Sequence, residues 1–251
     1  MINYIGQSQK EKSNSIIRVK IKKQKSFFTL LLLLLPFIFL LFENYPGLSP
    51  EKNSGDRMAT CKLTNPNGGT GTAFLVGKNG LLITARHCVD DLAVGETVSL
   101  NFDKIKEPGF DNLQAEVVFF PEDIKDDFAV IKLIKKLDII GLEPPSNPVE
   151  DPSSYNPKIN IIGYPGIANS QSIAQNYVIN YQLKDSTIFM VEQSFPGYSG
   201  GPVIDIETGD VIGILVSGIT ESENEWMNQY IGLAFCEKIE QVFIKTPHLN
   251  W

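Results

Sequence analysis

The chain has 251 residues, of which 43% are hydrophobic, and a formal net charge of −7. Residues 1–26 hold seven basic side chains and one acidic one, so this segment carries +6, and taking it from the total leaves −13 for the rest. An acidic folded part argues against nucleic acid as a partner, because phosphate binding needs clustered Lys and Arg. The roughly 200 residues beyond about the first 45 suffice for one large domain or two small lobes with a substantial core.

Residues 27–42 form an uncharged apolar run of sixteen residues, F-F-T-L-L-L-L-L-L-P-F-I-F-L-L-F. A bilayer span needs about 20 apolar residues, and the hydrophobic part of a secretory signal peptide has about 7–15. The basic leader favours an N-terminus kept on the cytoplasmic side, and residues 43–50 offer no A-x-A-like cleavage site. We interpret the run as a transmembrane signal-anchor, with a cleaved signal peptide as the alternative.

Either interpretation predicts that the folded part is exported. It is then membrane-anchored and extracytoplasmic, or secreted or periplasmic if the segment is cleaved. We expect four parts along the chain: a basic tail at 1–26, the hydrophobic segment at 27–42, a linker at 43–57 and one folded domain at 58–251. The linker is rich in Pro, Gly, Ser and charge.

The domain consists of short apolar runs separated by turn signals. β-Branched and aromatic residues dominate these runs, which is typical of strands. Asn79-Gly80 joins the first two runs, and Thr208-Gly209 lies in a similar turn, as expected for hairpins. Residues 237–245 are one of the few stretches with helical spacing. The pattern predicts an all-β sandwich or barrel. The expected strands are 72–76, 81–85, 115–120, 128–133, 159–163, 177–181, 187–191, 202–206, 211–217 and 230–235.

Two features bear on how the domain is held together. The stretch 143–158 contains five prolines and is interpreted as a loop that crosses between two β lobes. The three cysteines, Cys61, Cys88 and Cys236, are an odd number and cannot all pair within the chain. One disulfide is possible in an exported compartment, but the spacings match no zinc pattern. We interpret the cysteines as small buried hydrophobes and expect no metal and no cofactor.

Three residue types with catalytic chemistry lie beside expected strands. His87 follows a strong strand, a position suited to a general base. Ser199 lies in P-G-Y-S-G-G-P-V, where glycines let backbone N–H groups converge on an oxyanion. Asp126 and Asp127 precede an apolar strand, where an aspartate can accept an N–H from an imidazole. Each alone has an ordinary explanation: a structural histidine, a Gly-Pro turn and a turn-forming aspartate.

Taken together, in the order His87, Asp127, Ser199, the three segments resemble those of the chymotrypsin/trypsin-like peptidase family. T-A-R-H-C is similar to the family's T-A-A-H-C, D-F-A-V-I-K-L to its D-I-A-L-L-K-L, and G-Y-S-G-G-P-V to its G-D-S-G-G-P. The resemblance covers about residues 58–245. It is closer to the bacterial, HtrA-like branch, without a PDZ domain.

The resemblance implies two six-stranded antiparallel β-barrels with the site between them and a short C-terminal helix, preceded by the hydrophobic segment. Ser199 would be the nucleophile, His87 the general base and Asp127 the residue that orients the imidazole, with Asp126 as a minor competitor. The N–H groups of Gly197 and Ser199 would form the oxyanion hole. We therefore expect a serine endopeptidase that cleaves polypeptides through an acyl-enzyme, with its oligomeric state left open.

Three positions depart from the family pattern. Tyr198 replaces the aspartate that precedes the serine in digestive members, so activation by an ion pair with a newly cut N-terminus is not expected. Thr72 stands where the partner of Cys88 would lie, which leaves this cysteine without its usual disulfide. Arg86 replaces a small residue beside His87, and we expect its side chain to crowd the site or to reach toward substrate.

The primary pocket is only coarsely predicted. Counting back from the serine places Gln193 at its floor, which argues against a preference for Lys or Arg. Ser217, Gly218 and Gly232 are expected to line the pocket and to leave it open. No histidine lies at 211–218, which argues against a preference for glutamate.

Two other functions fit parts of the sequence pattern. G-Y-S-G-G also fits the G-x-S-x-G nucleophile elbow of α/β-hydrolases, but that fold needs an acid and then a histidine after the serine. His248 alone follows Ser199, and the alternating helices of that fold are missing from the sequence pattern. The stronger alternative is a catalytically inactive, protease-like binding module, exported or anchored at the membrane. The presence of all three catalytic residue types favours the enzyme.

Overall fold

The computed structural model describes residues 52–145, 155–166, 170–180, 188–191, 196–218 and 233–251. The chain divides into two units, Met1–Ser49 and Pro50–Trp251. The predicted basic tail, the hydrophobic segment and most of the predicted linker lie outside the described residues. Within the described ranges, no helix is both long and apolar enough to cross a bilayer.

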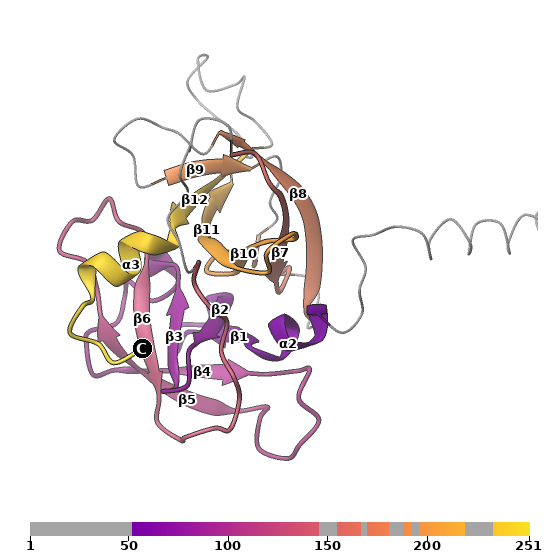
Figure 1. Ribbon diagram of the computed structural model, residues 1–251. Helices are drawn as coiled ribbons and strands as arrows, with labels where there is room; N and C mark the ends of the chain where they lie inside the picture. Colours follow the sequence, from indigo (N-terminus) through magenta and orange to yellow (C-terminus); the bar gives the residue numbers. More distant parts are fainter. Residues whose placement is uncertain (1–51, 146–154, 167–169, 181–187, 192–195, 219–232) are drawn as a thin grey trace, which may run out of the picture. The chain divides into compact units, whose positions relative to one another are not determined.

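Six antiparallel strands close into a first barrel in the order β1-β2-β3-β6-β5-β4 (Figure 1). Antiparallel pairing throughout lets adjacent strands be joined by short hairpins, as at Asn79-Gly80 between β2 and β3, where Gly80 has φ +73°. The strands are β1 (Thr60–Thr64), β2 (Thr70–Val76), β3 (Leu81–Thr84), β4 (Thr97–Asn101), β5 (Leu113–Phe119) and β6 (Ala129–Leu133).

A second barrel closes in the order β10-β11-β12-β9-β8-β7 (Figure 1). Its strands are β7 (Lys158–Gly163), β8 (Ser172–Asn180), β9 (Ile188–Val191), β10 (Pro202–Asp205), β11 (Val211–Gly218) and β12 (Ala234–Lys238). Three helical segments complete the described part: α2 (Lys52–Met58), the 3-10 turn η1 (Arg86–Cys88) and α3 (Ile239–Lys245).

Strands of the second barrel contribute to two separate apolar cores. In β7, Ile161 packs inside the second barrel, whereas Ile162 joins the core of the first barrel. In β10, Val203 likewise packs inside the second barrel and Ile204 joins the core of the first. Successive side chains of a strand point to opposite faces, so one strand can serve both cores. The two barrels are therefore packed together through buried apolar side chains, which fixes the position of the loops between them.

The predicted fold, two six-stranded antiparallel barrels with a short C-terminal helix, is confirmed. Strands β1 and β4 were not predicted, β8 begins earlier than expected, and β12 lies a few residues later. Helix α2 overlaps the last residues of the predicted linker. Two closed antiparallel barrels are incompatible with an α/β-hydrolase, so that alternative is wrong.

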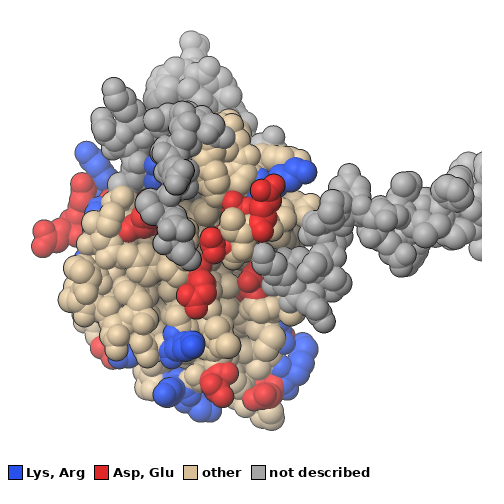
Figure 2. All heavy atoms as spheres, viewed as in Figure 1, with Lys and Arg blue, Asp and Glu red and all other residues tan. Residues whose placement is uncertain are grey.

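Charges on the described surface are mixed. On the face drawn in Figure 2, acidic side chains gather near the middle, and Lys and Arg lie mostly toward the edges. This face presents no continuous basic patch among the described residues.

Candidate active site

The register between β3 and β6 explains how His87 meets Asp127. Thr84, the last residue of β3, pairs with Ala129, the first residue of β6. Because the strands are antiparallel, the chain that leaves β3 and the chain that enters β6 lie at the same barrel end. His87 follows Thr84 by three residues and Asp127 precedes Ala129 by two. Residues forty positions apart in sequence are thus brought together by strand pairing.

His87 and Asp127 make two hydrogen bonds. The imidazole Nδ1 lies 2.8 Å from Asp127 Oδ2, and the His87 backbone N–H donates to Asp127 Oδ1 over 3.0 Å. One carboxylate therefore fixes both the ring and the main chain that carries it. With Nδ1–H donating to the carboxylate, the other ring nitrogen is free to accept a proton.

The alternative acid, Asp126, points elsewhere. Its carboxylate is nearly buried and forms an ion pair with Lys245 of α3. The structure thus separates the two adjacent aspartates into different tasks: Asp127 contacts the imidazole, and Asp126 joins the segment before β6 to the C-terminal helix.

The environment of His87 favours its protonated form. The hydrogen bond to Asp127, followed by the adjacent Cys88 thiol, raises the pKa of His87 to about 10 from an ordinary value of 6.5, although partial burial acts in the opposite direction. The imidazole ring remains partly open to solvent, with 43% of the side chain exposed. A strong carboxylate partner that stabilises imidazolium suits a base that must hold a proton during a reaction.

Arg86 does not act as expected from the sequence. Its guanidinium donates to the Pro121 carbonyl over 2.9 Å and lies 5.5 Å from the centre of the Phe120 ring. These contacts direct the side chain toward the segment between β5 and β6, which carries Asp127. Arg86 therefore stabilises the segment that carries Asp127. The expectation that its side chain crowds the site or reaches toward substrate is wrong.

Ser199 lies on a glycine-rich loop that enters β10. The Gly200 N–H donates to the Leu215 carbonyl over 2.7 Å, and the Leu215 N–H donates to the Gly201 carbonyl over 2.9 Å. A Cβ atom on Gly200, at φ +83°, would lie 2.2 Å from the Thr72 carbonyl oxygen. Glycine is therefore required where this loop presses against the first barrel.

Thr72 is the main link between that loop and the first barrel. Its backbone N–H donates to the Ser199 carbonyl over 2.8 Å. Its buried hydroxyl donates to the Gly197 carbonyl over 2.8 Å and accepts the Tyr164 N–H over 3.2 Å. Three residues of the second barrel are thus held by one threonine of β2, close to the point where β3 leads to His87.

Cys88 brings the serine loop next to the histidine segment. Its thiol lies 3.7 Å from the Ser199 carbonyl oxygen, and it directly follows His87 in the chain. The Ser199 hydroxyl makes no hydrogen bond to the imidazole among the described contacts; such contacts are often long when no substrate is bound. All three cysteines, each of them in a described range, are free thiols, and burial raises the pKa of Cys61 and Cys236.

The predicted pocket is described only in part. Ser217 and Gly218 lie at the exposed end of β11, in register with Phe235 and Ala234 of β12. Gln193 and Gly232 lie outside the described residues. Gly197 is described, with φ +96°.

Comparison with known families identifies the architecture. The sequence matches the family model described as a trypsin-like peptidase domain over residues 71–214, more than half of the chain. The chain belongs to the trypsin-like peptidase family. A comparison of the sequence with curated proteins found no match.

Solved structures share the fold of this trypsin-like peptidase. The inactive form of the Rv3671c protease has a TM-score of 0.57 and 17% identity, over 80% of this chain and 93% of that one. The active form of the M. tuberculosis protein has a TM-score of 0.56 and 16% identity, over 78% and 82%. The serine endoprotease from Yersinia pestis has a TM-score of 0.57 and 16% identity, over 77% and 64%. Identities this low show the fold alone.

Two contributors to the site were not found from the sequence. The sequence marks Thr72 only as an absent cysteine, and its patterning does not mark Tyr164 as a site residue. The signal for Tyr164 was the turn G-Y-P-G at 163–166, which directly follows an apolar strand. Tyr198, which stands where the digestive peptidases have aspartate, is 3% exposed in the core of the second barrel.

Proposed function

We propose that this trypsin-like peptidase is a serine endopeptidase that cleaves polypeptides through an acyl-enzyme. The single observation that carries the proposal is the paired hydrogen bonding of His87 with Asp127, 2.8 Å from the ring and 3.0 Å from the backbone N–H. It is supported by the anchoring of the Ser199 carbonyl to Thr72, over 2.8 Å, beside the histidine segment.

In the proposed reaction, the Ser199 hydroxyl attacks the scissile carbonyl while His87 takes its proton. Asp127 holds the imidazole in one tautomer and stabilises the imidazolium that forms. His87 then gives the proton to the leaving amine, which leaves an ester on Ser199. Water, with His87 again as base, attacks this ester and releases the second product.

Negative charge develops on the carbonyl oxygen during both attacks. The proposed donors are the N–H groups of Gly197 and Ser199, and loss of one such donor typically costs about 2.7–4 kcal/mol of barrier. Glycine at 197 supports this role, because its φ of +96° would strain any other residue. The exposed end of β11, with Ser217 and Gly218, is proposed to contact the substrate chain.

The decisive test uses a fluorophosphonate probe on the purified folded domain. Wild-type protein is expected to be labelled and Ser199→Ala not, and kcat for a peptide substrate should fall about a millionfold. Ser99→Ala, which alters a serine of β4, serves as the control and should be labelled like wild type. Absence of labelling in the wild-type protein would contradict the enzyme proposal and favour the inactive binding module.

The proposal includes a location. The basic tail at 1–26 and the apolar run at 27–42 support a domain exported across a membrane and held there, or released if the segment is cleaved. Protease digestion of intact cells that express the full chain tests this. A domain that stays protected until the cytoplasmic membrane itself is broken would contradict export.

A further inference from the structure

The peptide planes of the serine loop have fixed directions. The Pro196 carbonyl accepts the Gly166 N–H over 2.9 Å, and the Tyr198 carbonyl accepts the Gly201 N–H over 2.8 Å. In a trans peptide the C=O and the following N–H point in opposite directions. Anchoring these two carbonyls therefore turns the N–H groups of Gly197 and Ser199 away from Gly166 and Gly201, as a pair of oxyanion donors requires.

The anchor for the first of these planes is the turn after β7. Gly197 packs directly on this turn: a Cβ atom on Gly197 would lie 2.0 Å from the Tyr164 carbonyl oxygen and 2.7 Å from the Gly166 nitrogen. The Tyr164 N–H donates to the Thr72 hydroxyl, which donates onward to the Gly197 carbonyl. The position of the Tyr164 backbone consequently sets the position of Gly197.

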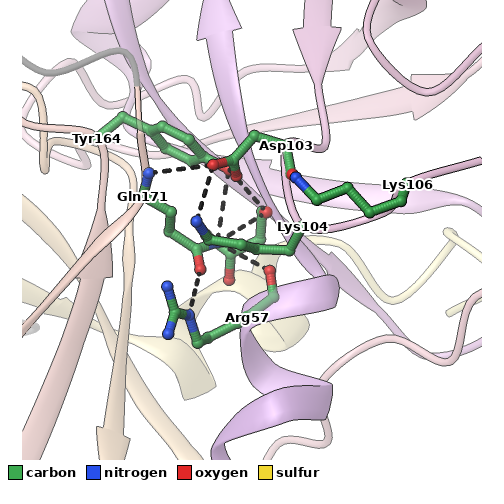
Figure 3. Close-up of polar contacts among 7 residues, drawn as sticks. Arg57, Asp103, Lys104, Lys106, Tyr164 and Gln171 are labelled. Carbon is green, nitrogen blue, oxygen red and sulfur yellow. Dashed lines mark hydrogen bonds and ion pairs between the residues drawn. The ribbon is translucent and has the colours of Figure 1, made fainter.

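The side chain of Tyr164 is held from the first barrel. Its hydroxyl donates to Asp103 Oδ1 over 2.6 Å, and the residue is 2% exposed (Figure 3). Asp103 lies just after β4, so this bond joins the two barrels. A buried tyrosine that satisfies its hydroxyl in this way has one orientation available.

Asp103 is itself held in the ionised form. Burial acts to raise the pKa of its carboxyl, but hydrogen bonds from Tyr164, Lys104 and the Gln171 backbone N–H outweigh this effect and lower the pKa. The Lys104 ammonium lies 2.9 Å from Oδ2, on the oxygen that Tyr164 does not use. Burial and the Asp103 charge raise the pKa of Tyr164, so the phenol stays a donor.

Helix α2 joins the same network. Arg57 Nε donates to Gln171 Oε1 over 3.0 Å, and the Gln171 amide donates back to the Arg57 carbonyl over 2.8 Å and to the Thr60 carbonyl over 3.1 Å. Figure 3 shows Arg57 at the end of the helix, directed toward Gln171. Through Gln171, whose amide also lies 3.5 Å from the Tyr164 hydroxyl, the segment that leads into the domain contacts the network around Tyr164.

We propose that Tyr164 and Asp103 are a positioning pair, which holds the turn at 163–166 so that the N–H groups of Gly197 and Ser199 face the substrate. The proposal rests on the proposed function. Tyr198, the residue before the serine, is packed in the core of the second barrel, and the Tyr164–Asp103 bond adds a polar contact from outside the serine loop. Neither Tyr164 nor Asp103 touches the reacting atoms.

The test measures kcat and KM separately for the folded domain and Tyr164→Phe. The variant keeps the ring and removes the hydroxyl that Asp103 holds. Loss of a whole oxyanion donor costs about 10²–10³ in kcat, so a tilted donor is expected to cost about tenfold. KM should stay within about twofold, because the donors act in the transition state more than in the bound substrate. Tyr177→Phe, a half-exposed tyrosine of β8, is the matched control and should leave kcat unchanged.

Two variants at Asp103 complete the design. Asp103→Ala should lower kcat at least as much as Tyr164→Phe does, because it also releases Lys104 and the Gln171 backbone N–H. The double variant should be little worse than Asp103→Ala, because both substitutions remove the Tyr164–Asp103 bond. Asp103→Asn, which keeps an oxygen acceptor, should recover part of kcat. The thermal unfolding midpoint is measured for each variant, so that loss of folded protein is separated from loss of turnover.

The outcomes are distinct. An unlabelled, inactive wild type would overturn the proposed function and the positioning pair with it. An active wild type with unchanged kcat in Tyr164→Phe and Asp103→Ala would overturn the positioning pair alone. A fall in kcat that matches the loss of folded protein, or additive effects in the double variant, would also contradict the pair.

Discussion

The two barrels contribute to the site by different means. The first barrel supplies side chains: His87 and Asp127 leave and enter paired strands, and their geometry is a contact between an imidazole and a carboxylate. The second barrel supplies a backbone: the loop around Ser199 is oriented through carbonyls and N–H groups, and glycine allows its close approach to the first barrel.

This difference indicates which substitutions each half tolerates. A side-chain contact can be removed with an isosteric residue while the barrel stays intact, because the strands around it are held by their own ladder. A backbone contact cannot be removed that way; it fails when an added Cβ atom or a displaced neighbour moves the chain. Substitutions in the first half should thus change chemistry at constant stability, and those in the second half should change both.

The largest effect is expected for Asp127→Asn in the first barrel. The loss of the charge and of the fixed tautomer should lower kcat by about 10⁴-fold, as is typical of this substitution in a Ser-His-Asp site. The unfolding midpoint should fall only by the stability that the protonated His87 contributes through this contact. The exposed Asp138→Asn is the control. A change of kcat below tenfold would mean that the His87–Asp127 contact is not part of the reaction.

The same variant carries a pH prediction. Because the pKa of His87 is raised to about 10, its proton stabilises the folded state fully below pH 6.5, and this contribution is lost as the pH rises toward 10. The base form is needed for attack, so kcat/KM should rise with pH on the alkaline side of 6.5. In Asp127→Asn, NMR titration of the imidazole should show a pKa that moves back toward 6.5; an unmoved pKa would contradict this.

A smaller effect is expected for Gly200→Ala in the second barrel. The new Cβ atom would lie 2.2 Å from the Thr72 carbonyl oxygen and 2.4 Å from the Thr84 hydroxyl, at a φ of +83°. A shift of the nucleophile by about 1 Å can cost about a hundredfold in rate, and the strained backbone costs about 1–3 kcal/mol of stability. Fluorophosphonate labelling rates and urea unfolding measure the two. Gly69→Ala, with its nearest atom 3.8 Å away, is the control; equal behaviour of both variants would contradict the backbone interpretation.

The smallest effect is expected for Lys245→Met. This variant tests whether the ion pair with Asp126 helps to hold the segment before β6, which also carries Asp127, against α3. It leaves the nearly buried Asp126 carboxylate without its cation. Because Lys245 is partly exposed, we expect a loss of about 1–2 kcal/mol in the free energy of unfolding, less than for a fully buried pair. The double variant with Asp126→Asn should be more stable than the single one, since no charge is left buried. If urea unfolding gave the wild type and Lys245→Met the same free energy of unfolding, this role of the Lys245–Asp126 pair would be contradicted.

Much of this molecule could be predicted from its sequence. His87, Asp127 and Ser199 could be singled out because each sits beside an apolar strand that is easy to find, and the predicted contact between His87 and Asp127 is present. Their catalytic roles stay predictions. The choice of Asp127 over Asp126 also follows from its position directly before the strand. The two-barrel fold followed from resemblance, because strand patterns alone leave a sandwich and a barrel equally open.

Other features could not be predicted, for identifiable physical reasons. β1 and β4 alternate buried apolar residues with polar ones, as with Val98 and Leu100 in β4, which is a strand pattern but a weak one over only five residues; the strands that were predicted have longer apolar runs. Tyr164 and Asp103 are sixty-one positions apart, and a hydrogen bond over that distance leaves no local pattern. Arg86 was misjudged because its partner is a backbone carbonyl, which has no sequence signature.

Thr72 shows what a missing cross-link can provide. A disulfide between positions 72 and 88 would fasten the first barrel to itself. The Thr72 hydroxyl instead forms hydrogen bonds with the Gly197 carbonyl and the Tyr164 N–H, which belong to the other barrel. A covalent bond within one barrel is thus replaced by hydrogen bonds between the two barrels. Reducing agents do not break these hydrogen bonds. The halves of the site are brought into alignment by folding itself, without waiting for an oxidant.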